Sequence, residues 1–167
     1  VSGKVEQKIS YVKYFAPLDW MVGSGEYMEA VENRLKQKAA DHILNMRFAS
    51  DGYTSIYQND GKIISVPSVG RLAGFNIYEA KDPLEQKTKE IVSIQTEQAK
   101  KGGGFYRYEW IKPSTGRDTP KIAYAEEYKE WGWIIATGTY IDDIITEEKK
   151  RTEEIREIHK HKLISTI

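Results

Sequence analysis

Tyrosine and tryptophan side chains recur at every second position in the segment "FYRYEWI". Residues two apart on a β-strand share a face, so Tyr106, Tyr108 and Trp110 would form one aromatic wall. Small-molecule sites have walls of this kind together with a few fixed polar groups. A buried phenol also needs a hydrogen-bond partner, which a ligand carboxylate could supply. The alternative is that these rings only pack beneath helices.

The residues expected to bind a ligand carry aromatic rings, hydroxyl groups or positive charge: Arg47, Tyr53, Tyr57, Ser65, Tyr106, Tyr108, Trp110, Lys121 and Tyr124. Arg47 and Lys121 are the best candidates for holding a carboxylate, because guanidinium and ammonium groups bind carboxylates well. Arg47 could instead satisfy the last carbonyls of a helix. Lys121, at the start of a strand, could equally be solvated. Arg71 in the long loop could close over a ligand, but most loop arginines are simply exposed, and Lys112 is an equally weak candidate.

Other kinds of chemistry find little support in the chain. It has no cysteine, which excludes disulfides, thiolate chemistry and cysteine-based zinc sites. His159 and His161 are two residues apart and would diverge on a helix, so they make a poor metal pair. The glycines 102–104 end a helix and lack the lysine of a phosphate loop. We therefore expect no catalytic residues, metal or cofactor, and no enzyme activity.

Composition limits the class of protein. The 167 residues suffice for one domain, or one domain plus part of another, and 40% are hydrophobic. The 25 basic and 25 acidic residues give no net charge, which argues against general nucleic-acid binding. No run of apolar residues is long enough to span a membrane.

The pattern of apolar residues predicts an α+β fold. Expected strands cover 8–16, 20–27, 53–58, 62–67, 105–111, 121–128 and 133–140. Apolar residues spaced three and four apart predict a helix from Tyr27 to near Phe48. A second helix should begin at Asp82-Pro83 and end before the glycines at 102–104, and a charged third helix should cover Ile141 to about Lys160. Five of the strands then form an antiparallel sheet with helices over one face.

A repeat connects the two ends of the chain. "KISYVKYFAPLDWMVGSGEY", from Lys8 to Tyr27, aligns without a gap with "KIAYAEEYKEWGWIIATGTY", from Lys121 to Tyr140, and six of the twenty positions are identical. Each copy is an expected hairpin followed by a helix. We therefore expect 1–27 to be the terminal hairpin of a truncated preceding module, 28–147 to be a complete module and 148–167 to be a charged stalk helix.

Three stretches resemble the Cache sensor domains of bacterial and archaeal receptors. They are "MRFASDGYTSIYQNDGKIISVPS", "KKGGGFYRYEWIKPS" and "PKIAYAEEYKEWGWIIATGTYIDDI". The resemblance covers Arg47 to Ile144 and implies a PAS-like five-stranded antiparallel sheet with flanking helices, a long N-terminal helix and a C-terminal stalk. The repeated hairpin suggests the double-Cache type. Such modules lie outside the cytoplasmic membrane, and "LISTI", at 163–167, would begin a membrane span.

The chain departs from this family at two places. Val66 stands where similar members often have histidine before the proline, and the loop "SVGRLAGFN" is one residue longer than usual. Both differences bear on which ligand is bound.

The expected function is extracytoplasmic sensing of a small molecule, with carboxylates favoured, for a chemoreceptor or sensor histidine kinase. We expect a membrane-anchored parent protein, a homodimer through the helices and no nucleic-acid partner. The ligand would lie between the sheet and the loop 66–82, and the last hairpin would pass a shift to the helix after Tyr140. The alternative is a membrane-proximal spacer that binds nothing and transmits a signal sensed by the missing module. A hydrolase would need a nucleophile and base that the sequence does not offer.

Overall fold

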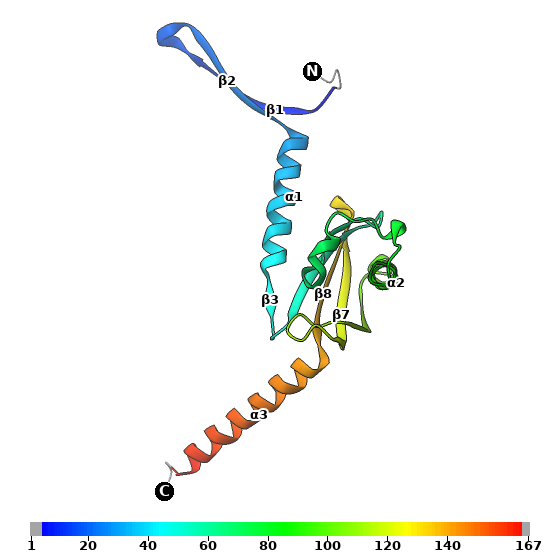
Figure 1. Cartoon of the computed structure of the whole chain (residues 1–167). Coiled ribbons are helices and arrows are strands. Elements are labelled where there is room, and N and C mark those ends of the chain that lie inside the picture. Colours follow the sequence, from blue (N-terminus) through cyan, green and yellow to red (C-terminus); the bar gives the residue numbers. More distant parts are fainter. Residues whose placement is uncertain (1–4, 165–167) are drawn as a thin grey trace. The chain divides into compact units, whose positions relative to one another are not determined.

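A computed structural model describes residues 5–164 of the chain (Figure 1). It divides into two compact units, residues 1–43 and residues 44–167. The division falls near the end of the first long helix, so that most of this helix groups with the N-terminal hairpin. The expected module boundary after residue 27 stays a prediction.

The first unit is a hairpin followed by a helix. Strand β1 (Lys8–Phe15) pairs antiparallel with β2 (Trp20–Tyr27) through a short 3-10 turn, η1 (Ala16–Leu18), and α1 (Met28–Asn45) follows directly. Both faces of the hairpin are exposed, aromatic residues included. A two-stranded hairpin is at best marginally stable in water without further packing.

The second unit is built on an antiparallel sheet of six strands. They are β3 (Arg47–Phe48), β4 (Gly52–Gln58), β5 (Ile63–Ser65), β6 (Gly104–Ile111), β7 (Asp118–Tyr128) and β8 (Trp133–Tyr140). The strand order is β3-β4-β8-β7-β6, and β5 also pairs with β4. The expected five-stranded PAS-like sheet is confirmed. The sixth strand, β3, is a two-residue addition where the first helix was expected to continue, because α1 already ends at Asn45.

One face of the sheet is covered by a loop and a helix (Figure 1). The loop contains two 3-10 turns, η2 (Pro67–Leu72) and η3 (Ile77–Glu79), and leads into α2 (Pro83–Lys100). The Asp82 carboxylate accepts from the Glu85 N–H, and the Glu85 carboxylate accepts from the Asp82 N–H, which makes a capping box. These two hydrogen bonds confirm that the helix starts at the predicted place.

The last helix, α3 (Ile141–Ile164), continues from β8 without a loop. From Glu147 to His161 its side chains are exposed. None of the helices within residues 5–164 is both long and apolar enough to cross a membrane. The expected start of a membrane span at 163–167 falls outside the residues whose side chains are described.

The repeat in the sequence is also a repeat of hairpin geometry. Lys8 pairs with Tyr27 as Lys121 pairs with Tyr140, and the register is the same along both hairpins. Each turn is a three-residue 3-10 helix that ends in a left-handed residue, Asp19 in one and Gly132 in the other. Two stretches with the same pairing and the same turn favour one ancestral hairpin over a chance likeness.

Candidate functional site

The centre of the sheet has a floor of small side chains. Tyr53, Gly138, Ala123 and Tyr106 lie in one cross-strand row, running from β4 through β8 and β7 to β6. Residues paired across neighbouring strands share a face, so the two tyrosines flank a glycine and an alanine. The small residues on β8 and β7 make room for the Lys121 side chain, because a Cβ at Gly138 would lie only 2.9 Å from Lys121 Cε. The aromatic residues on β4 and β6 stand on either side of them.

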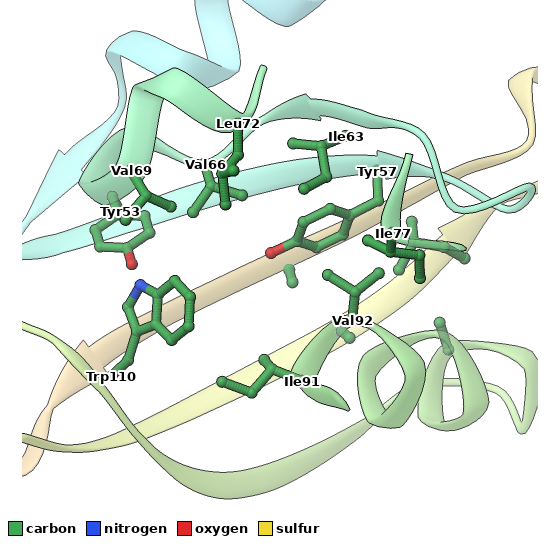
Figure 2. Close-up of a cluster of buried hydrophobic side chains, with 14 of the residues drawn as sticks. Tyr53, Tyr57, Ile63, Val66, Val69, Leu72, Ile77, Ile91, Val92 and Trp110 are labelled. Atoms are coloured by element: carbon green, nitrogen blue, oxygen red, sulfur yellow. The ribbon is translucent and has the colours of Figure 1, made fainter. Parts of the chain in front are cut away.

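A cavity lies on the same face of the sheet, between β4, β6, α2 and the start of the loop. Its lining mixes aromatic, aliphatic and hydroxyl side chains: Tyr53, Ser55, Tyr57, Val66, Thr88, Ile91, Val92, Tyr108 and Trp110. About 10 Å³ of it is open to the centre of a water molecule, which is roughly the space of one water. In Figure 2, Val66, Val69 and Leu72 come from the loop on one side, and Ile91 and Val92 come from α2 on the other.

Ser68, on η2, ties the loop to the walls of the cavity. Its Oγ lies 2.7 Å from the Tyr53 hydroxyl and accepts a hydrogen bond of 2.7 Å from the Trp110 indole N–H. Figure 2 shows the Tyr53 hydroxyl and the Trp110 nitrogen turned toward the same point. One serine therefore satisfies the polar atoms of two buried aromatic residues, and the loop closes on the sheet through it.

Lys121 is a buried cation on the face of the sheet that carries the cavity. It is 1% exposed, and its Nζ lies 3.3 Å from the centre of the Tyr53 ring and 5.0 Å from that of Tyr140. Within the described part of the chain no carboxylate forms a salt bridge with it, and Asp51, which acts on it electrostatically, bonds to Ser114 instead. Burial lowers the pKa of the Lys121 ammonium to about 7, against the opposing influence of Asp51.

The phenols of the site are held in their neutral form. Burial raises the pKa of Tyr53 to about 12, although its hydrogen bond to Ser68 lowers it. Burial also raises the pKa of Tyr57, Tyr106 and Tyr108. The cavity is therefore lined by neutral phenols, and Lys121 lies beside it over the Tyr53 ring.

The structure brings together most of the expected site. Tyr53, Tyr57, Tyr108 and Trp110 line the cavity, the Tyr106 ring stacks on that of Tyr108 with centroids 5.4 Å apart, and Lys121 lies over Tyr53.

Arg47, Ser65 and Tyr124 lie apart from this group. Arg47 is exposed and donates to the carbonyl oxygens of Leu44 and Met46, which is the capping role weighed as its alternative. Tyr124 pairs with Phe105 across the strands and its ring contacts that of Phe105. Tyr124 therefore lies on the opposite face from Tyr106, away from the cavity that the other expected ligand-binding tyrosines line.

Several functional candidates were missed from the sequence. Ser68 lies in a loop whose sequence has no regular period. The residues next to it give no indication that its hydroxyl bonds to Tyr53 and Trp110, which are distant in the sequence. The buried face of α2 could have been predicted from the sequence, because its residues follow helical spacing: Thr88, Ile91, Val92 and Gln95. The expected pocket was bounded only by the sheet and the loop, whereas α2 supplies a third side.

Lys112 marks a second polar centre, at the start of α3. It is buried, and its Nζ lies 2.8 Å from Asp142, 2.6 Å from Asp143 and 3.7 Å from Asp51. Burial by itself would lower the pKa of Lys112, but the hydrogen bonds to Asp142 and Asp143 raise it above its usual value. Three carboxylates from two distant segments therefore gather around Lys112, which was a weak candidate for contact with a ligand.

Comparison with known proteins identifies the family. A model of the Cache domain matches residues 2–145 of the chain. The chain belongs to the Cache domain family. The resemblance stated from the motifs is thereby confirmed, and the match includes the N-terminal hairpin as well as the complete sheet.

Curated relatives of this Cache chain are signalling proteins. It is 32% identical over 112 residues to the sensor histidine kinase MctS of Rhizobium johnstonii, and 29% identical over 113 residues to the methyl-accepting chemotaxis protein McpP of Pseudomonas putida. Each alignment covers 67% of this chain, but only 24% and 20% of the two relatives. The chain thus spans about a quarter or less of the length of these relatives.

Solved structures agree on the fold. A methyl-accepting chemotaxis protein from Vibrio parahaemolyticus is 34% identical, with a TM-score of 0.56 over 67% of this chain and 74% of that one. A Cache chemosensory domain described for its recognition of carboxylic acids is 26% identical, with a TM-score of 0.54 over 68% of this chain and 79% of that one.

Proposed function

We propose that this Cache chain is the extracytoplasmic sensing domain of a transmembrane receptor, a chemoreceptor or a sensor histidine kinase, and that it binds a small carboxylate. The observation that carries the proposal is Lys121, a buried lysine beside a cavity with no carboxylate of the described residues paired to it. An unpaired buried charge is costly, and a ligand carboxylate would compensate it. The role is recognition without catalysis.

Binding requires the cavity to grow, because a small carboxylate is larger than one water. The loop at η2 is the part most readily displaced, since Ser68 holds it to Tyr53 and Trp110 by two hydrogen bonds. A carboxylate that accepts from the Tyr53 and Trp110 donors would replace Ser68. The ligand would therefore favour an arrangement in which the loop has moved, and its differential affinity would shift the balance between the two arrangements.

The route from the cavity to α3 is short. Lys121 pairs in register with Tyr140, the last residue of β8, and the Tyr140 hydroxyl donates to the Ile111 carbonyl at 2.6 Å. The next residue along β6 and its loop is Lys112, which binds Asp142 and Asp143 in the first turn of α3. A change at Lys121 would thus reach the start of the stalk helix, and two such helices in a homodimer would carry it across the membrane.

One observation favours a second function, that of a spacer without a ligand. The cavity holds roughly one water, and a filled site is what a spacer that only transmits a signal would have. In that case Lys121 would be a structural residue that packs on Tyr53, and no small molecule would stabilise the domain.

A thermal-shift screen of the chain against small carboxylates, amino acids and amines tests the proposal. A ligand at a hundred times its Kd adds about 2.7 kcal/mol to the free energy of unfolding. For a protein of this size that raises the Tm by roughly 5–10 °C. We expect carboxylates alone to give such a shift, and expect it to disappear in Lys121→Met.

The matched control is Lys101→Met, which removes the same charge from an exposed pair with Glu97 and should keep the shift. A well-folded protein that no carboxylate stabilises would support the spacer role. Stabilisation by amines in place of carboxylates would overturn the assignment of the ligand class.

A further inference from the structure

Two buried polar atoms beside the cavity have no hydrogen-bond partner. Among residues 5–164, Gln95 Oε1 and the Tyr106 hydroxyl are buried and unpaired. Gln95 is 1% exposed, so its amide is withdrawn from solvent. Buried polar groups are nearly always bonded, and an exception in a folded protein calls for an explanation.

Both groups adjoin the cavity described above. Gln95 follows Ile91 and Val92, which line the cavity, on the buried face of α2. Tyr106 stacks on Tyr108, another lining residue. The Gln95 amide is also near enough to the phenols of Tyr57 and Tyr106 to lower the pKa of each, although burial raises both overall.

Lys121 and Tyr106 lie on the same face of the sheet. Tyr106 and Tyr53 stand at the two ends of the row that contains Gly138 and Ala123, and Lys121 lies over Tyr53. A ligand in the cavity whose carboxylate binds Lys121 beside Tyr53 would have its other end toward Tyr108, on which Tyr106 stacks, and toward Gln95 on α2. An aliphatic chain there would leave both polar atoms unpaired and withdrawn from water, which is unfavourable.

The chemistry of the two atoms restricts what the far end of the ligand can be. Gln95 Oε1 only accepts hydrogen bonds, so it needs a donor, whereas the Tyr106 hydroxyl can donate or accept. A single hydroxyl group meets both needs, since it can donate to Gln95 and accept from Tyr106. An ammonium group would add a second buried charge with no described carboxylate beside it, which disfavours amino acids.

We propose that Gln95 and Tyr106 form a second polar subsite and select a hydroxycarboxylate over an unsubstituted carboxylate of the same chain length. This inference rests on the proposed carboxylate-binding function. The simplest alternative is that a small rotation lets Tyr106 donate to Gln95, in which case the pair only stabilises the fold.

The test compares butanoate with 2-, 3- and 4-hydroxybutanoate by isothermal titration calorimetry on the 167-residue chain. We expect one hydroxylated isomer to bind at least about tenfold more tightly than butanoate, because it alone satisfies both atoms. In Gln95→Met and Tyr106→Phe the ratio of the two affinities should fall to less than about threefold. Tyr124→Phe, on the opposite face, and Gln98→Met, on the same helix, are the matched controls and should keep the preference.

A thermal melt without ligand separates the subsite from a structural pair. The subsite predicts that Gln95→Met and Tyr106→Phe melt at or above the wild-type temperature, because each removes an unpaired buried atom. Lower melting temperatures for both would show that the two side chains bond to each other, and would overturn the inference. Equal affinity for butanoate and every hydroxybutanoate would also overturn it and leave carboxylate binding intact. No binding of any carboxylate would refute the proposed function itself.

Discussion

The Lys121 ammonium lies 3.3 Å from the centre of the Tyr53 ring. Contact with an aromatic face offsets part of the cost of burying the cation, but the pKa of Lys121 still falls from 10.5 to about 7. Between these values the unfolded chain binds more protons than the folded chain, so this lysine makes stability rise with pH. Below about pH 7 both states are protonated and its contribution no longer changes.

We predict a pH-dependent difference in stability between wild type and Lys121→Met. From about pH 7 to pH 10 the wild-type free energy of unfolding should rise relative to the variant by up to about 1.4 kcal/mol per pH unit. Urea unfolding at several pH values measures it. Parallel curves for the two proteins would mean that Lys121 titrates near its usual value, and Lys101→Met should run parallel to wild type in any case.

Ligand affinity should also depend on pH. A bound carboxylate would raise the pKa of Lys121, so binding above about pH 7 takes up a proton and the affinity falls by up to tenfold per pH unit. Calorimetry at pH 8 in two buffers of different ionisation enthalpy detects this proton uptake. Affinity that is constant from pH 6.5 to pH 9 would remove Lys121 from the site.

Ser68→Ala should loosen the loop over the cavity. The substitution leaves the Tyr53 hydroxyl and the Trp110 indole N–H buried without their partner, which costs about 1–3 kcal/mol of stability. Hydrogen exchange should quicken at residues 67–72. Ser93→Ala removes an exposed hydroxyl that bonds within α2 and should cost much less. An unchanged stability in Ser68→Ala would show that Ser68 does not hold the loop.

Lys112→Met should release the start of α3. It leaves the buried carboxylates of Asp51 and Asp143 without their cation, and breaking such a buried pair costs about 3–5 kcal/mol. Hydrogen exchange at residues 140–146 reports the loosening at the helix start. Lys101→Met breaks an exposed pair and should cost less than about 1 kcal/mol. Similar exchange in the two variants would contradict the role of Lys112 as the anchor of the stalk.

Most of the architecture was predictable because local rules agree with the fold. Asp82-Pro83 begins α2 as its capping chemistry requires, and the glycines after Lys101 end it. Alternation in "FYRYEWI" correctly separated the buried and partly buried rings of Trp110, Tyr106 and Tyr108 from the exposed side chains between them. The strand β3 was not predictable, since a two-residue strand has no period and depends on its pairing with Gly52 and Tyr53.

The site was predictable only in part, because it depends on pairing between distant segments. Alternation along β6 assigned Tyr106 and Trp110 to one face, but the face of Tyr124 depends on the register between β6 and β7. The sequence of neither strand alone determines that register. The burial of Lys112 has the same cause, since its partners Asp51 and Asp142 lie far away in the sequence.

The most direct test of the central claim is to locate the bound carboxylate by NMR. Intermolecular nuclear Overhauser effects would be measured between the aliphatic protons of the best-binding carboxylate and the aromatic protons of the chain. The account predicts contacts with the rings of Tyr53, Tyr108 and Trp110, lost in Lys121→Met and retained in Lys101→Met. Contacts with Phe105 and Tyr124, on the opposite face of the sheet, would contradict it.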